Sequence, residues 1–200
     1  MREALLLYTI WIGYIMGKVP REYEEVDESE MMVFTVKQPN HLAYTYQMKH
    51  AYMLGSLFNL PPNTTIRNLE LVKAEPYNAC RRIVNVANRP LAYLVARGDC
   101  SFSQKAENVE EAGGKLMMIS DTSLSKPQDF INMLPDSSLK SAGIPCVYIS
   151  SITGHYFREH LEYYDDPIIM DIPVAKSTSF WLNHQRRAPW ELWPEDSWFI

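Results

Sequence analysis

The spacing of hydrophobic and polar positions changes along the 200-residue chain. In the first half, short runs rich in β-branched and aromatic residues are separated by turn residues, which is typical of strands. Residues 32–36 and 42–46 are two such runs, and the Gln-Pro-Asn-His turn at 38–41 predicts a hairpin between them. Residues 69–72 form a further strand candidate, which Glu75-Pro76 ends.

From Leu91 the pattern changes to that of a crossover unit. Residues 91–96 are almost continuously apolar, which predicts a strand covered on both faces. Ser101, with Gln104 three residues later, predicts a helix start, and Gly113-Gly114 predicts its end. A strand over 115–120 follows. A strand, a helix and a strand in about thirty residues make a βαβ unit, which implies parallel pairing and a right-handed crossover.

The same theme recurs towards the C-terminus. We expect a short helix over 127–134, a strand over 146–150, a second amphipathic helix over 153–162 and a closing strand over 168–174. The predicted fold class is therefore α/β, rich in strands, with two main helices and parallel βαβ crossovers.

The ends of the chain differ from this folded region. Residues 1–17 combine Arg2, an apolar run shorter than the roughly 20 residues of a membrane-spanning helix, and small Gly17. We interpret them as a cleavable signal peptide, with an uncleaved N-terminal helix as the alternative. Residues 18–31 are an acidic lead-in, and the tail over 176–200 holds four of the five tryptophans.

Composition and charge limit the classes of function. A 46% hydrophobic content suffices for one sizeable core, which we place at residues 32–175. The net charge of −5 argues against nucleic acid as a partner, because phosphate contacts need clustered Lys and Arg. Arg81-Arg82 and Arg186-Arg187 are expected to be solvated surface charge. No other run approaches membrane length, so we expect no membrane span in the mature chain and no cofactor.

The three cysteines and one sequon favour export. Cys80 and Cys100 flank a predicted strand, so we pair them in a disulfide. Cys146 lies inside an apolar run and is expected to be a small, buried, inert hydrophobe. Asn63-Thr64-Thr65 is a glycosylation sequon directly after two prolines, where a surface loop is expected. We therefore expect a secreted, extracellular glycoprotein.

Several ordered motifs in the second half resemble the protease-associated (PA) domain. The segment 94–102 contains Arg97-Gly98-Asp99-Cys100-Ser101-Phe102, which is similar to the family's Arg-Gly-x-Cys-x-Phe turn between a strand and a helix. Ala112-Gly113-Gly114, the strand 117–121 and the Ile-Pro strand at 144–149 follow in the family's order. Together with Gly154 and Leu161, these motifs cover roughly residues 71–174.

The resemblance implies a fold of the swivelling β/β/α type and a function without chemistry. Such domains accompany subtilisin-like proteases, zinc aminopeptidases, transferrin receptor and vacuolar sorting receptors, where they bind proteins or peptides or govern access to an active site. We therefore predict a secreted, non-catalytic recognition or regulatory module. Its partner would be a protein or an extended peptide, bound for example by adding a strand to an open sheet edge.

Two other classes of function have weaker support in the sequence. Ser150, His155 and Asp165 are the residue types of a hydrolase triad, but there is no Gly-x-Ser-x-Gly elbow, and Ser150 is better explained as a helix cap. The five histidines are scattered without a metal-binding motif, so no metal site and no catalytic residue are assigned. A luminal sorting receptor would need a membrane segment to couple cargo to transport.

The remaining candidates concern partners. Arg97-Gly98-Asp99 is the tripeptide that integrins recognise, so a cell-adhesion ligand is an alternative function, although the PA turn itself already requires Arg and Gly. Trp190 and Trp193 are either partner anchors or residues that fold back onto the domain, and we favour packing.

Overall fold

The computed structural model describes residues 31–51, 53–56, 65–86, 89–136, 142–173 and 186–191. The predicted signal peptide, most of the acidic lead-in, Asn63 and Trp193 lie outside these residues. The strands are β1 (Met31–Gln38), β2 (Thr45–His50), β3 (Thr65–Lys73), β4 (Leu91–Ala96), β5 (Leu116–Ser120), β6 (Cys146–Tyr148) and β7 (Ile168–Pro173). The helices are α2 (Phe102–Glu111) and α3 (Ser151–Tyr163), with 3-10 turns η2 (Asn40–Leu42) and η3 (Pro189–Glu191).

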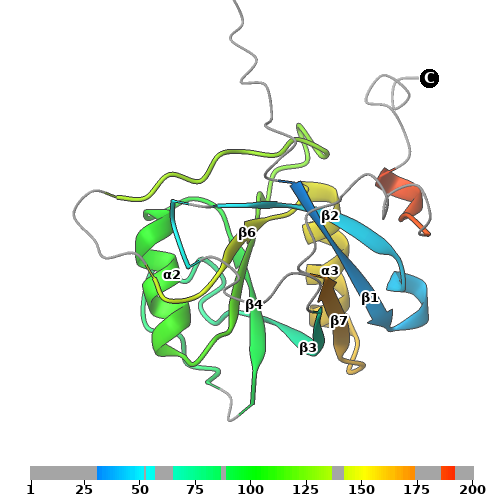
Figure 1. The fold of residues 1–200 in the computed structure, drawn as a ribbon, viewed down its shortest axis with the longest axis horizontal. Coiled ribbons are helices and arrows are strands. Elements are labelled where there is room, and N and C mark those ends of the chain that lie inside the picture. The colour runs from blue at the N-terminus through cyan, green and yellow to red at the C-terminus, as the bar shows by residue number, and fades with distance from the viewer. Residues whose placement is uncertain are drawn as a thin grey trace, which may run out of the picture.

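The seven strands close into a barrel in the order β1-β2-β6-β5-β4-β3-β7 (Figure 1). The predicted hairpin is confirmed, because β1 and β2 pair antiparallel with Phe34 opposite Tyr46, although β2 begins three residues later than expected. The parallel crossovers are also confirmed, since β3, β4, β5 and β6 pair in parallel.

Closure of the sheet corrects one expectation. The last strand, β7, pairs antiparallel with both β1 and β3, so the open edge proposed for strand addition is wrong. The weakest seam of the barrel is between β2 and β6, where the register holds only two residue pairs, Lys49 with Tyr148 and His50 with Val147.

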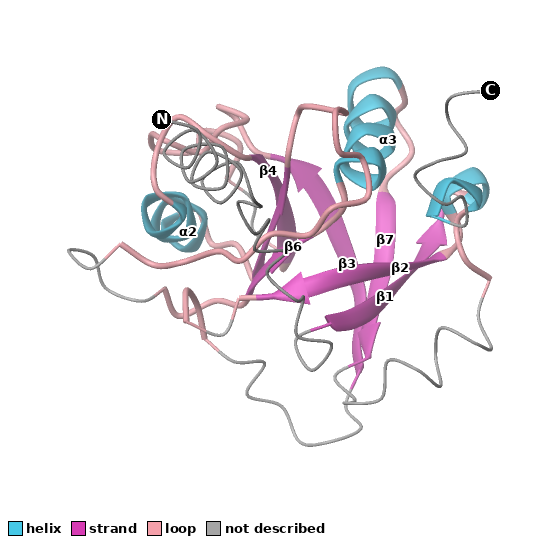
Figure 2. Ribbon diagram, turned by 90° about the horizontal axis from the view of Figure 1, so that it is seen from above, coloured by secondary structure: helices cyan, strands magenta, loops and turns pink. Residues whose placement is uncertain are grey.

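Two hydrophobic clusters lie on opposite faces of the parallel strands. Alternation along β4 shows the division, because Ala92 and Leu94 belong to one cluster and Leu91, Tyr93 and Val95 to the other. The first cluster includes side chains from all seven strands and from α3, and the second packs under α2. Figure 2 shows the two helices on separate sides of the strands. The expectation that β4 is covered on both faces is confirmed.

Local signals set the helix boundaries as predicted. The Ser101 hydroxyl accepts a hydrogen bond from the Gln104 backbone N–H at 3.3 Å, which caps α2. After the helix, Gly113 has a φ of 86°, a left-handed conformation that costs glycine little. Ser150 caps α3 in the same way through the backbone N–H of Thr153.

The helix predicted over 127–134 is wrong, because the structure has an irregular segment there. Phe130, Ile131 and Met133 still pack on the second cluster, with Met133 only 4% exposed, whereas Leu134 is exposed. Tertiary hydrogen bonds hold both ends of this stretch, since the carbonyl of Pro127 accepts from the N–H of Ile152 and, just beyond the segment, the N–H of Asp136 donates to the Ser103 hydroxyl. An eight-residue helix is marginal by itself, so these tertiary contacts decide the conformation.

Candidate partner-binding surface

The carboxyl ends of the parallel strands bring several polar segments together. The turn over 97–100 follows β4, Asp121 follows β5 and Asn78 lies in the loop after β3. Neighbouring parallel strands deliver the loops that follow them to the same end of the barrel, so these segments can act together. Arg97, Gly98 and Asp99 are all exposed here.

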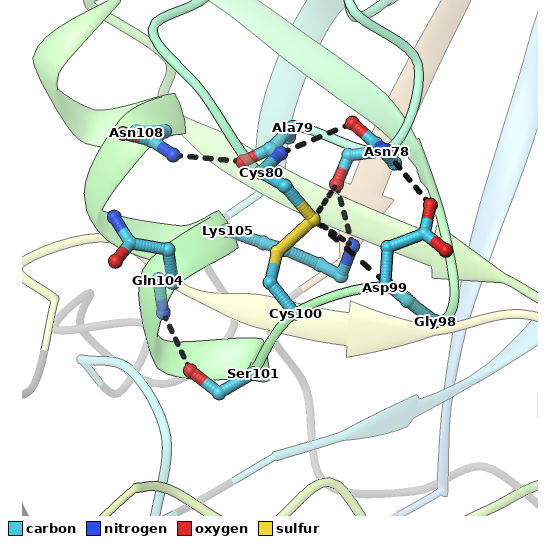
Figure 3. The surroundings of a disulfide bond; sticks show 10 residues. All are labelled: Asn78, Ala79, Cys80, Gly98, Asp99, Cys100, Ser101, Gln104, Lys105 and Asn108. Carbon is cyan, nitrogen blue, oxygen red and sulfur yellow. Dashed lines mark hydrogen bonds between the residues drawn. A yellow bond between two sulfur atoms is a disulfide. The ribbon is translucent and has the colours of Figure 1, made fainter.

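Covalent and hydrogen bonds hold this turn in one conformation. Cys80 and Cys100 form a disulfide with their Cα atoms 5.7 Å apart, so the predicted pairing is confirmed. The Asn78 side-chain amide donates to the Asp99 carboxylate at 2.8 Å (Figure 3). Gly98 and Asp99 have φ values of 98° and 68°, so the chain turns through two consecutive left-handed residues. The turn is therefore presented as a fixed shape.

Arg97 is held by a second acidic residue, which the sequence analysis did not assign to the site. Its guanidinium donates to Asp121 at 2.8 Å, and the other oxygen of Asp121 accepts from the backbone N–H of Ser123. Partial burial acts to raise the pKa of Asp121. The hydrogen bonds from Ser123 and Arg97, with the charge of the guanidinium, outweigh burial and hold this pKa below its ordinary value. The sequence could have indicated Asp121 through its position, because it directly follows a buried strand.

A buried lysine lies beneath the disulfide. Lys105 is fully buried, and its ammonium donates to the backbone carbonyl of Asn78 and contacts the sulfur of Cys80 at 3.4 Å (Figure 3). Burial lowers the pKa of Lys105, and the charge of Asp99 opposes that shift. The neighbouring Asn108 amide donates to the carbonyl of Ala79, so two residues of α2 anchor the loop that carries Cys80.

The comparisons with known proteins agree with this arrangement. A family model described as PA domain matches residues 67–156, which contain the disulfide, the turn and both helix starts. Residues 67–156 of the chain thus match a PA domain. The "PRADC1-like protein" of Drosophila melanogaster is 32% identical over 133 residues, which are 64% of this chain and 65% of the relative.

Two further proteins are similar to parts of this chain. "Receptor homology region, transmembrane domain- and RING domain-containing protein 6" of Arabidopsis thaliana is 41% identical over 54 residues, covering 24% of this chain and 17% of that protein. A solved aminopeptidase from Aneurinibacillus sp. strain AM-1 aligns with a TM-score of 0.45 at 19% identity, covering 72% of this chain and 30% of the enzyme. The chain thus spans less than two thirds of each of these proteins.

Two residues of the hypothetical hydrolase triad, Ser150 and His155, have other partners, and the third, Asp165, is exposed after the end of α3. Ser150 is 2% exposed, and its hydroxyl donates to the hydroxyl of Thr153 at 2.9 Å. The imidazole of His155 is bonded to Arg158 and lies 3.4 Å from the carboxylate of Glu159. The single hydroxyl proton of Ser150 is therefore directed at Thr153, which is the geometry of a helix cap.

The aromatic tail contributes one described tryptophan, which packs on the domain. The Trp190 ring lies 4.2 Å from that of Tyr156, and its indole N–H donates to Thr153 at 3.3 Å. Packing is confirmed for Trp190. Arg187 departs from the expected surface position, since it is half-buried and donates to the backbone carbonyl of Glu191.

Glu191, which the sequence analysis did not single out, is half-buried as a residue, and its carboxylate lies against the start of α3. One carboxylate oxygen accepts from the Thr153 hydroxyl at 2.8 Å, while the other is buried without a hydrogen-bond partner among the described residues. Burial raises the pKa of Glu191 to about 7. The Thr153 hydrogen bond, the charge of Arg187 and the backbone N–H of Gln47 oppose the shift without cancelling it.

The last features to compare with the structure are Cys146, metal binding and a membrane span. Cys146 is a buried free thiol, as expected, and burial raises its pKa to about 12. Within the ranges that the structure describes, no group of three or more His, Cys, Asp or Glu side chains is arranged to hold a metal ion. Among the same residues, no helix is long and apolar enough to cross a membrane.

Proposed function

We propose that the chain is a secreted recognition module that binds another protein or an extended peptide at the turn over 97–100 and performs no chemistry itself. The observation that carries the proposal is the exposed Arg97-Gly98-Asp99 turn, held by a disulfide, an ion pair and a side-chain hydrogen bond. A surface that is already ordered loses little conformational entropy when it binds, so such a turn suits recognition.

The surroundings of the turn indicate the kind of partner. Arg97 is 44% exposed in its side chain although Asp121 contacts it, so part of the guanidinium remains available to a carboxylate or a backbone carbonyl. Because the barrel is closed, recognition by side chains and loop backbone replaces strand addition. The relative that has a receptor homology region in its name supports a binding role. We also propose that the fold is of the swivelling β/β/α type.

The adhesion alternative is less well supported by the geometry. An integrin ligand presents Arg and Asp side chains that are free to reach the receptor, whereas here Arg97 is paired with Asp121 and Asp99 accepts from Asn78. Replacing Asp99 by Glu in a cell-adhesion assay separates the two functions, because loss of adhesion on this change would favour the integrin ligand.

A peptide-display experiment tests the proposal. The full chain is used to select binders from a library of linear peptides, and the selected peptides are measured against Arg97→Ala and Arg89→Ala. Arg89 is the matched control, since it is an exposed arginine paired with Glu70 at the opposite end of β4. We expect at least about tenfold weaker binding to R97A and little change in R89A. Equal binding to both variants, or no enrichment over repeated rounds, would contradict the proposal.

A further inference from the structure

The Cys80–Cys100 disulfide lies in surroundings that differ from those of an inert structural bridge. Both cysteines are half-buried at the surface, next to the exposed residues 97–99. Neither belongs to the barrel, because Cys80 lies in the loop after β3 and Cys100 precedes α2. Both cysteine residues are therefore partly accessible to solvent on the side of the turn.

A buried positive charge is in contact with one of the two sulfurs. The ammonium of Lys105 lies 3.4 Å from Cys80 Sγ, and the side chain is fully buried. An adjacent ammonium stabilises a thiolate relative to a thiol, and burial leaves that attraction little screened by salt. The charge of Asp99 acts on Lys105 in the opposite sense, but Asp99 is exposed and is therefore screened. The carbonyl oxygens of Asn78 and Gly98 lie 3.5 and 3.9 Å from Cys80 Sγ and oppose a thiolate, but they carry only partial charges. The full charge of Lys105 therefore favours the thiolate at Cys80.

The second sulfur has a weaker source of stabilisation. Cys100 directly precedes Ser101, the cap of the ten-residue helix α2. Backbone N–H groups at the start of a helix favour a nearby negative charge, but only by a partial charge. Cys80, which contacts a full charge, is consequently the better leaving group of the two.

We propose that the Cys80–Cys100 bond is a reducible redox switch, in which Lys105 stabilises the departing Cys80 thiolate while an external thiol attacks Cys100. In the first step the thiolate of the reductant forms a bond to Cys100 Sγ, and the bond between the cysteines breaks with its electron pair on Cys80. In the second step another thiol of the reductant attacks the mixed disulfide and releases the Cys100 thiolate. Two electrons pass to the protein, and the two thiol groups of the reductant are oxidised to a disulfide.

The consequence is local to the turn. Among the described residues, the bond is the covalent tie between the loop over 78–80 and the turn over 97–100. Without it, the Asn78–Asp99 hydrogen bond still joins the two segments, while Lys105 joins the loop over 78–80 to α2. Reduction therefore loosens the presented surface while the seven-stranded barrel keeps its pairing. This inference goes beyond the proposed recognition role and does not require a partner.

The first test maps the site of attack in the unaltered chain. The full protein is equilibrated over a graded series of reduced to oxidised glutathione, quenched in acid, and analysed by peptide mass mapping. We expect the glutathione adduct on Cys100 rather than Cys80, and we expect reduction at glutathione ratios that leave ordinary structural disulfides oxidised. An adduct mainly on Cys80, or a bond that resists the whole series, overturns the inference.

The second test isolates the charge. Lys105→Met keeps much of the side-chain volume but removes the ammonium, and exposed Lys115→Met is the matched control. We expect K105M to lower the equilibrium constant for reduction by about tenfold or more, because a close charge pair is lost, and K115M to leave it unchanged. Native near-ultraviolet circular dichroism of the oxidised variants shows that the fold is retained. A folded K105M with an unchanged constant overturns the inference, and should K105M not fold, the adduct position in the unaltered chain decides.

Discussion

The buried carboxyl group of Glu191 should make the free energy of unfolding depend on pH. The substitution Glu191→Gln replaces it with a neutral group of nearly the same shape. The pKa of Glu191 rises from its ordinary value of 4.5 to about 7, mainly through burial. At about 1.36 kcal/mol for each pKa unit, the penalty for holding the ionised group in the folded chain is at most about 3 kcal/mol.

The sign follows from which state binds the proton more tightly. The folded chain has the higher pKa, so the stabilisation from proton binding is fully present below pH 4.5 and is lost as the pH rises through about 7. In E191Q the group cannot ionise, so this loss is absent. We expect E191Q to match the unaltered protein at pH 4.5 and to be more stable at pH 8, by up to about 3 kcal/mol.

Urea unfolding at pH 4.5, 6 and 8 measures this difference, because all other titrating groups are common to both proteins and cancel. Glu111→Gln is the control, since Glu111 is exposed on the last turn of α2. The amide of Thr45, which donates to the carbonyl of Arg186 at 2.8 Å, reports locally whether the segment that carries Glu191 stays docked. A stability difference that does not vary with pH would refute the reasoning.

Three further outcomes are expected. Gly154→Ala should destabilise the domain by about 1–3 kcal/mol in thermal unfolding, because a Cβ at this position overlaps the side chain of Ser120. Alanine normally favours a helix, so helix propensity alone predicts the opposite. Ser120→Gly in the same chain should restore stability. Purified protein should not hydrolyse a fluorogenic peptide library, and hydrolysis that Ser150→Ala abolishes would show an enzyme instead. Intact mass of the chain recovered from culture medium should show loss of about 17 residues, a glycan removed by Asn63→Gln and one disulfide, whereas an uncleaved, unglycosylated mass would refute the signal cleavage and the glycan, and absence of the chain from the medium would refute export.

The amino-acid sequence by itself determined the elements whose signals lie within a few neighbouring residues. The apolar run over 91–96 is a strand with both faces buried, because neither face carries polar side chains that could be exposed to solvent. Ser101 and Gly113 mark the start and the end of α2, because a capping residue acts on backbone groups of the same turn. Cys80 and Cys100 were paired from position alone, and the similarity to the PA domain came from motifs in a fixed order.

Only the tertiary structure decided which distant segments meet. Residues 127–134 have a helix-like composition, yet they follow an irregular path in which the carbonyl of Pro127 accepts from the N–H of Ile152 and Met133 is buried in the second cluster. The sheet closes because β7 returns to pair with β1, more than 130 positions earlier. Lys105 and Glu191 are charged residue types that normally stay in water, and no pattern around either predicts burial. Burial depends on neighbours brought by other elements, and that information is absent from a local stretch of sequence.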